Sequence, residues 1–206
     1  MIKLKDLLKL NKMTYNSGPD GGHNKKMMRP LNLFKEEYSL PNQLPPENSS
    51  AITLDEVRYL QAMKVNKKFV EKHDDILKVF KETLLELELP YIKEEIHSLL
   101  KESGKFVMEL KYKYNRPRPY QIAEFYGLEL NGVDMKSMKT PSYPSGHAVQ
   151  GYLIGMHYGN RHPEYAKAFK QLGEDIAHSR MIAKAHYPSD KTFGKKVAEY
   201  LYTLLK

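Results

Sequence analysis

The sequence of 206 residues predicts an all-α protein: a single bundle of about six or seven helices with an irregular N-terminal arm. From residue 53 onwards, apolar residues recur at intervals of three and four, the period of an amphipathic helix. The alternation of apolar and polar residues typical of strands is nearly missing. Because the length suits one domain with an appended arm, we divide the chain into residues 1–50 and 51–206.

The predicted arm, residues 1–50, differs in composition from the rest of the chain. A short amphipathic stretch from Ile2 to Leu10 leads into two segments rich in Pro, Gly, Asn and Ser, NSGPDGGHNKK and LPNQLPPENSS. Such segments are typical of irregular structure. Tyrosine, phenylalanine and leucine residues are scattered through the arm, so we expect that it could wrap the domain.

The first helices of the bundle are predicted from their start and stop signals. Thr53 followed by Glu56 predicts a capping box that opens a helix. A second apolar face spans residues 76–87. Pro90 can occupy the first turn of a third helix. This third helix must end near Asn115, because the prolines at 117 and 119 cannot continue it.

The later helices follow the same logic. Residues 119–142 are expected to form a connection with one short helix. Ser145 and Gly146 begin another helix, which contains the small residues Gly151 and Gly155 and so allows a neighbouring helix to approach closely.

Pro163 is expected to open a long helix, whose apolar face repeats at spacings of four, three, four, three and four over residues 165–183. Pro188 is expected to end this helix, and Ser189 to cap the last one.

Composition limits the classes of ligand and location. The net charge of +8 favours anionic ligands such as phosphate esters, nucleic acid or acidic membranes, although scattered lysines are also ordinary surface residues. The absence of cysteine excludes disulfides and thiolate metal sites. The sequence contains no run of about 18 apolar residues, so it predicts no transmembrane helix. The N-terminus lacks the apolar core of a secretory signal. We therefore expect a cytoplasmic or otherwise soluble protein.

Three groups of polar residues occur at the predicted helix ends. They are Lys111-x6-Arg118-Pro119, Pro144-Ser145-Gly146-His147 and Ser179-Arg180-x5-His186-x3-Asp190. Each group alone has an ordinary alternative: a solvated helix face, a capped turn with a surface histidine, and a structural pair at a helix end. Their occurrence together, in this order and at these spacings, indicates one chemical site.

The third group has the residues of a nucleophilic site. Because Ser179 lies on the buried face of its helix, Arg180 should emerge at the edge of the core, where its guanidinium suits paired phosphate oxygens. His186 follows at the end of the helix, and the turn at Pro188 returns Asp190 towards it. A carboxylate beside an imidazole fixes the ring tautomer, so the other ring nitrogen can act as a nucleophile.

The other two groups can bind an anion. Ser145 and Gly146 offer backbone N–H groups at the positive end of a helix dipole. His147, in the first turn of that helix, can donate a proton to a bound group. Lys111 lies about two turns before Arg118, so the two cations can converge as a phosphate clamp. His73, Asp74 and Asp75 could imitate a metal site, but neighbouring helix positions point apart. We expect them at the surface, with no metal bound.

The three groups together resemble the tripartite signature of the type 2 phosphatidic acid phosphatase (PAP2) superfamily. That superfamily includes soluble class A non-specific acid phosphatases, to which the chain is closest in style, and also membrane lipid phosphatases and vanadium haloperoxidases. The similarity covers residues 111–190. Its register uses Arg118, because Glu109 stands where a lysine would be needed for the other Arg-Pro pair, Arg116-Pro117.

The resemblance implies a role for each residue of the signature. Lys111, Arg118 and Arg180 would bind the phosphoryl oxygens together with Ser145 and the amide of Gly146. His147 would be the general acid, His186 the nucleophile, and Asp190 its orienting partner.

These roles predict a metal-independent phosphatase that hydrolyses phosphate monoesters through a phosphohistidine, with phosphotransfer to an alcohol as an extension. No cofactor is expected, and vanadate should bind as a mimic of the phosphoryl transition state. The alternatives are a vanadate-dependent haloperoxidase and a non-catalytic phosphate-binding protein. The expected partner is a small phosphate ester; no nucleic acid is required, and a homo-oligomer is left open.

Overall fold

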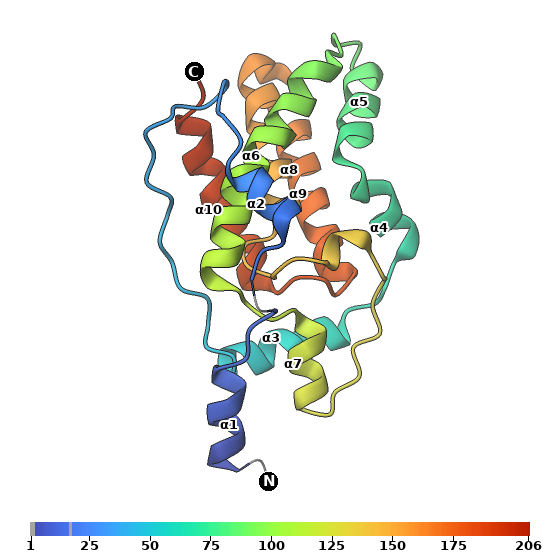
Figure 1. The fold of residues 1–206 in the computed structure, drawn as a ribbon. Helices are drawn as coiled ribbons and strands as arrows, with labels where there is room; N and C mark the ends of the chain where they lie inside the picture. The colour runs from blue at the N-terminus through green and yellow to red at the C-terminus, as the bar shows by residue number, and fades with distance from the viewer. Residues whose placement is uncertain (1–2, 17) are drawn as a thin grey trace.

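The computed structural model, which describes residues 3–16 and 18–206, confirms the all-α prediction (Figure 1). These residues form no β-strand, and their one isolated bridge pairs Phe34 with Leu205. The α-helices are α1 (Leu4–Asn11), α2 (Gly21–Met27), α3 (Ala51–Ala62), α4 (Lys67–Asp74), α5 (Ile76–Glu86), α6 (Lys93–Tyr114), α7 (Pro119–Phe125), α8 (Gly146–Arg161), α9 (Ala166–Ile182) and α10 (Pro188–Thr203). Two short 3-10 helices, η1 (Lys136–Met138) and η2 (Pro163–Tyr165), complete the set. No described helix is long and apolar enough to cross a membrane.

Helices α8 and α9 form the centre of the bundle and pack with their backbones in contact. A Cβ atom added at Gly155 would lie 2.7 Å from the carbonyl oxygen of Phe169, and one at Gly173 would lie 2.9 Å from that of Gly151. The predicted close approach at Gly151 and Gly155 is therefore confirmed. Helices α6 and α10 pack against α8, and α4 and α5 lie on the other side of the bundle (Figure 1).

A second apolar cluster closes one end of the bundle, where α1, α3 and α7 meet (Figure 1). Leu10 of α1 is fully buried there with Leu60 of α3 and Ile122 of α7. Tyr187, which precedes α10, belongs to the same cluster. This end of the bundle supports the loops that carry the candidate site.

The arm wraps the domain and contains two helices. Helix α2 lies against α6, and the segment that follows runs along the bundle to α3 (Figure 1). Phe34 is fully buried in the main core, and the chain pairs on both sides of it, Lys35 N with Leu204 O and Lys206 N with Leu33 O, both at 2.9 Å. The expectation of an irregular arm was wrong for residues 21–27, because Asp20 caps α2 and α6 provides a surface for it.

Several helix boundaries also differ from the prediction, and eight α-helices lie within the described residues 51–206, more than expected. Ser50, not Thr53, caps α3, since its Oγ accepts from the N–H of Thr53 at 3.2 Å. Helix α4 was missed, although Asn66 caps it. Helix α6 begins at Lys93, after Pro90, and ends at Tyr114 as predicted.

The turn between α9 and α10 is earlier than predicted. Helix α9 follows the single turn of η2 and ends at Ile182, five residues before Tyr187. Pro188 therefore opens α10 instead of ending α9. The cap of α10 is provided by Asp190, whose Oδ2 accepts from the N–H of Tyr187 at 3.0 Å, and not by Ser189.

Candidate functional site

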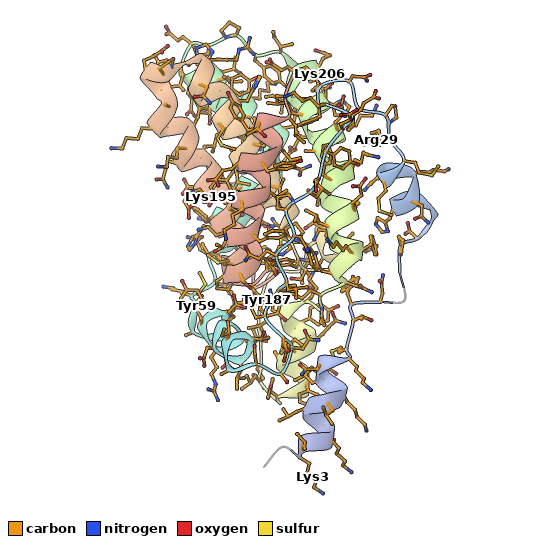
Figure 2. All side chains as sticks on the ribbon, turned by 90° about the vertical axis from the view of Figure 1, so that its left-hand side faces the viewer. Lys3, Arg29, Tyr59, Tyr187, Lys195 and Lys206 are labelled. Atoms are coloured by element: carbon orange, nitrogen blue, oxygen red, sulfur yellow. The ribbon has the colours of Figure 1, made fainter. Side chains whose placement is uncertain are left out.

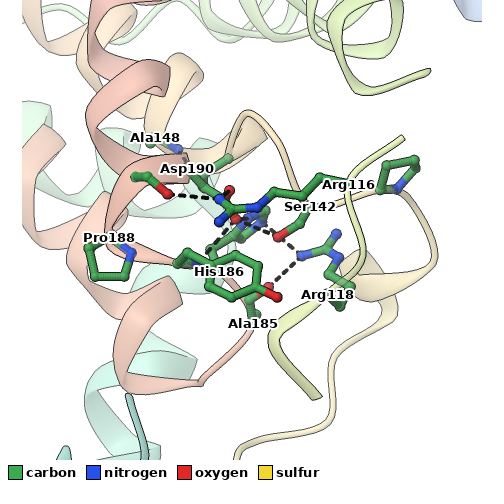
Figure 3. Close-up of polar contacts among 12 residues, drawn as sticks. Arg116, Arg118, Ser142, Ala148, Ala185, His186, Pro188 and Asp190 are labelled. Atoms are coloured by element: carbon green, nitrogen blue, oxygen red, sulfur yellow. Dashed lines mark hydrogen bonds and ion pairs between the residues drawn. The ribbon is translucent and has the colours of Figure 1, made fainter. Parts of the chain in front are cut away.

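The three groups of predicted residues lie at neighbouring helix ends. Figure 3 shows Arg118 of the first group beside His186 and Asp190 of the third. Lys111 and Arg118 lie where α6 gives way to α7, and the PSGH segment lies at the start of α8. Arg180 belongs to the last turn of α9, and His186 and Asp190 flank the start of α10. The fold thus converts three distant stretches of sequence into neighbouring helix ends.

His186 and Asp190 form a buried pair. The Nδ1 atom of His186 lies 3.0 Å from Oδ2 of Asp190, which is fully buried. The same carboxylate accepts from Ser142 Oγ and, at 2.7 Å, from Arg116 Nη1 (Figure 3). Burial alone would raise the pKa of Asp190, but Arg116 and the bond from His186 hold it well below its ordinary value. Asp190 is therefore ionised, and Nδ1 of His186 is the protonated ring nitrogen.

The second ring nitrogen of His186 is an acceptor. Its Nε2 atom lies 2.9 Å from Nη1 of Arg118, and a guanidinium nitrogen is a donor with no acceptor capacity. Burial, with Arg118 next, lowers the pKa of His186 well below 6.5. The ring is neutral near pH 7 and holds its lone pair on Nε2, which is the form needed for nucleophilic attack.

Arg118 and Lys111 are almost fully buried cations. Arg118 donates from Nε to Thr140 O at 2.8 Å, and from Nη1 to Ala185 O at 2.8 Å. Burial lowers the pKa of Arg118 to about 10, so its charge persists at neutral pH. Lys111 Nζ donates to the carbonyl of Pro141, and burial lowers its pKa well below the ordinary value.

Arg180 is 1% exposed and is held by two partners. Its Nη1 lies 2.6 Å from Oδ1 of Asp74, and its Nη2 donates to Ser137 Oγ at 2.7 Å. Arg118 Nη2 donates to the carbonyl of the same Ser137 at 3.1 Å, so the two guanidinium groups flank one residue. The Nε atom of Arg180 has no hydrogen-bond partner in the described part of the chain.

Of the three residues expected at the surface, Asp74 and Asp75 are exposed, but the expectation was wrong for His73, which is 3% exposed. Asp74 also contacts the candidate site. Although its side chain is 49% exposed, it pairs with Arg180, and its backbone oxygen lies 3.0 Å from Nε2 of His147. Asp74 ends α4, and Asp75 has an extended conformation that caps α5. This break directs Asp74 to the site, whereas a continuous helix would not have done so.

The start of α8 provides the amides of the site. Ser145 caps the helix: its Oγ accepts from Ala148 N at 3.3 Å. A Cβ atom at position 146 would lie 3.2 Å from Val107 Cγ1, so glycine lets the helix end lie close to α6. The first N–H groups of an α-helix have no intrahelical acceptor, which leaves the amide of Gly146 available to a ligand.

His147 lies next in the same turn, with a side chain that is 18% exposed. Burial, followed by the charge of Arg180, lowers the pKa of His147. Contacts with Asp74, whose Oδ1 is 3.5 Å from Nε2, act in the opposite direction. His147 is thus between a cation and a carboxylate that control its protonation.

Sequence reasoning missed Arg116 and Glu56. Arg116 is 2% exposed, donates to Ser189 Oγ and Asp190 Oδ1 at 2.7 Å, and lies 3.1 Å from Glu56 Oε2. Its guanidinium also stacks on the Tyr187 ring at 3.8 Å. The sequence assigns Arg116 no role in the signature, because its Arg-Pro pair lies in the wrong register. In the structure Arg116 is buried directly before Pro117, just after the end of α6.

A cleft of about 580 Å³ opens over these residues. Among the predicted residues, its lining includes Lys111, Arg118, Gly146, His147 and His186. Ser145, Arg180 and Asp190 are not among the lining residues. Ser145 directly precedes Gly146, Arg180 donates to Ser137, and Asp190 bonds to His186, and these three neighbours do line the cleft. The described residues include no group of three or more acidic or histidine side chains arranged to hold a metal ion.

A buried histidine–carboxylate pair beneath clustered cations, at the end of a helical bundle, defines an all-α protein with a candidate anion-binding site. The family model of the PAP2 superfamily matches residues 99–205, and the chain belongs to this superfamily. The resemblance inferred from the three groups of residues is thereby confirmed.

Two curated proteins are similar in sequence. A non-specific acid phosphatase of Salmonella typhimurium is 31% identical over 97 residues, which cover 47% of this chain and 38% of that protein. Another from Salmonella typhi is 29% identical over 113 residues, or 54% of this chain and 44% of that protein. The chain thus matches less than half the length of either relative.

Similarity in fold extends to solved structures. The crystal structure of a bacterial vanadium-dependent iodoperoxidase matches 81% of this chain and 51% of its own, with a TM-score of 0.59 and 16% identity. At this identity the match supports the helical architecture alone.

Proposed function

We propose that the protein is a phosphatase that hydrolyses phosphate monoesters through a phosphohistidine at His186. The observation that carries the proposal is the state of His186, whose Nδ1 is held by Asp190 at 3.0 Å while Nε2 keeps its lone pair among cations. Similarity to non-specific acid phosphatases supports the same activity class. A non-catalytic phosphate-binding protein would need the cations but not this arrangement of His186 and Asp190.

The phosphoryl group would be bound by Lys111, Arg118, Arg180 and the amide of Gly146. Buried donors are normally paired, so the partnerless Nε of Arg180 is suited to a phosphoryl oxygen. Ser145 uses its oxygen as an acceptor, and its hydroxyl hydrogen can donate to the same group. Three cations would stabilise the negative charge of the transferring phosphoryl group.

The reaction would proceed in two displacements. The lone pair of His186 Nε2 attacks phosphorus, the ester P–O bond breaks, and the leaving oxygen takes a proton from His147. His147 then accepts a proton from water as the water oxygen attacks phosphorus, and the P–N bond breaks to release phosphate and restore His186. Asp190 would stabilise the charged ring of the phosphohistidine.

A vanadate-dependent haloperoxidase is the second candidate, and the fold shared with an iodoperoxidase favours it. Vanadate would occupy the position of the phosphoryl group, held by the same cations. Both functions would use His186, so the site residues do not distinguish them, and activity assays must.

The test is turnover of p-nitrophenyl phosphate by the wild type and by His186→Ala. We expect His186→Ala to lose activity while keeping its fold, whereas His178→Ala, on α9 outside the cleft lining, should retain it. A reaction quenched with alkaline detergent should trap an acid-labile, base-stable phosphoprotein in the wild type only. Near-normal turnover by His186→Ala would refute the mechanism.

Two further experiments distinguish the proposed phosphatase from a metal-dependent enzyme and from a haloperoxidase. Activity should survive EDTA, because the positive charge of the proposed site comes from Lys111, Arg118 and Arg180, and orthovanadate should inhibit competitively. A requirement for added metal would contradict the proposal. Strong bromination of a phenol dye with vanadate, bromide and peroxide, together with feeble phosphatase activity, would promote the haloperoxidase.

A further inference from the structure

The N-terminal arm forms one wall of the cleft that contains His186. Besides the proposed catalytic residues, the lining includes His23, Lys26 and Arg29 from the arm, together with Lys101 of α6 and Lys139. Figure 1 shows α2 lying across α6, and Figure 2 shows Arg29 on the segment that leaves α2 beside it. The arm thus extends the cleft beyond the residues of the PAP2 signature.

The wall is held in place by contacts on both sides of the cleft. Arg29 Nη1 donates to the carbonyl of Lys101 at 2.8 Å, and the ring of His23 lies 2.9 Å from the Tyr112 hydroxyl. Glu102, which is 5% exposed, accepts from two consecutive amides of the arm, at residues 32 and 33. Tyr15 also donates to Met138 O at 2.8 Å. The arm is therefore a fixed part of the cleft.

The charge of the cleft has one sign. Of the described residues that line it, none is acidic, whereas six are lysine or arginine and four are histidine. The overall charge of the protein does not explain this: a cleft of similar volume, about 540 Å³, between α8, α9 and α10 mixes three lysines with Glu174 and Glu199. Lys105, beside the arm, is neutralised by Glu109 at 3.3 Å, but Lys26 and Lys101 form no ion pair within the described chain.

The cleft is also larger than one phosphoryl group requires. Its volume of about 580 Å³ lies in the range of pockets that enclose whole small molecules. Three cations at its base would already balance a single phosphate. The outer cations therefore lack a function in the hydrolysis of a simple monoester.

We propose that Lys26, Arg29 and Lys101, together with Lys139 of the same lining, form a second anion subsite, and that the preferred substrates are small molecules with two phosphate groups. One phosphate would be transferred to His186 while the other is held by the arm. The proposal rests on the proposed function and adds to it the class of substrate. It also gives the arm a function: selecting the substrate.

The experiment compares alkanediol bisphosphates of three to six carbons with the monophosphates of the same diols. For the wild type we expect kcat/KM for each bisphosphate, divided by kcat/KM for the matching monophosphate, to lie well above two. A factor of two would follow simply from having two equivalent phosphates. In the double variant Lys26→Gln/Lys101→Gln, this ratio should fall about tenfold, since each partly exposed ionic contact contributes a few-fold. The preference should also weaken as NaCl screens the outer charges.

Lys25→Gln is the matched control, because Lys25 is also an exposed lysine of α2 but does not line the cleft. It should leave the ratio unchanged. A wild-type ratio near two, or a ratio unaffected by the double variant, would overturn the subsite and leave the phosphatase standing.

Absence of turnover with every compound would instead refute the proposed function. Calorimetric titration of the same bisphosphates and monophosphates would then test the subsite alone. Tighter binding of bisphosphates that is lost in the double variant supports it, and equal affinities refute it.

Discussion

Replacing Arg116 by methionine tests whether the site depends on the buried ion pairs behind it. Arg116 is 2% exposed and contacts two carboxylates, Asp190 at 2.7 Å and Glu56 at 3.1 Å. Methionine fills part of the same volume but donates no hydrogen bond. The variant therefore leaves two largely buried carboxylates without their shared cation.

The size of the effect follows from this burial. Removing one partner of a buried ion pair typically costs about 3–5 kcal/mol, because the remaining charge is left uncompensated. The stacking of Arg116 on Tyr187 at 3.8 Å would be lost as well, but the two contributions are not additive. In a chain of 206 residues, each kcal/mol corresponds to about 2–4 °C in Tm, so we expect Tm to fall by about 10 °C.

Urea unfolding followed by far-ultraviolet circular dichroism measures the loss in the free energy of unfolding, and thermal unfolding followed in the same way measures the fall in Tm. The control is Arg58→Met, since Arg58 and Asp55 form an exposed pair at 3.8 Å that should contribute less than about 1 kcal/mol. A loss of less than about 1 kcal/mol in Arg116→Met would refute the reasoning. It would mean that Ser142 and the Tyr187 amide satisfy Asp190 without Arg116.

Two further predictions concern helix packing and the proposed general acid. Gly155→Ala should lower the free energy of unfolding by about 1–3 kcal/mol, since its Cβ would meet a backbone oxygen at 2.7 Å. Gly104→Ala should raise the free energy of unfolding by about 0.5–1 kcal/mol, because Gly104 lies in the interior of α6 and an added Cβ would meet nothing within 4 Å. Urea unfolding measures both changes, and a stabilised Gly155→Ala with a destabilised Gly104→Ala would contradict both predictions. Asp74→Asn should lower the pKa of His147 further, because Asp74 opposes the lowering by burial and Arg180. If protonated His147 is the acid, the alkaline limb of the pH profile of kcat/KM should move to lower pH, and an unchanged or higher limb would refute its role.

Much of the fold could be predicted from local rules. The end of α6 follows from the prolines that succeed Asn115, and the start of α8 follows from the capping residue Ser145. Periodicity identified the buried faces, including the buried position of Ser179, whereas Arg180, expected at the edge of the core, is almost fully buried. These features depend on residues close in sequence, which is why the sequence displays them.

The missed features depend on contacts between distant residues. Asp74 and Arg180 are 106 positions apart, and no periodicity indicates that they pair. Glu56 fits a capping box with Thr53 equally well by sequence, but its carboxylate instead accepts from the Ser189 amide at 2.6 Å. Helix α2 is short and glycine-rich, so it depends on its packing against α6 as well as on its Asp20 cap.

The pairing of residues 33–35 with residues 204–206 has a consequence for the order in which the protein can be made. The partners are separated by roughly 170 positions, and ribosomes add about 5–20 residues per second. Residues 33–35 are therefore synthesised roughly ten seconds or more before residues 204–206, with which they pair. During that interval the helices around α6 can already pack together, while the apolar side chain of Phe34 is not yet covered by residues 204–206. The pairing of residues 33–35 with residues 204–206 can thus form only after the helices between them have been synthesised, and until then Phe34 is available for aggregation.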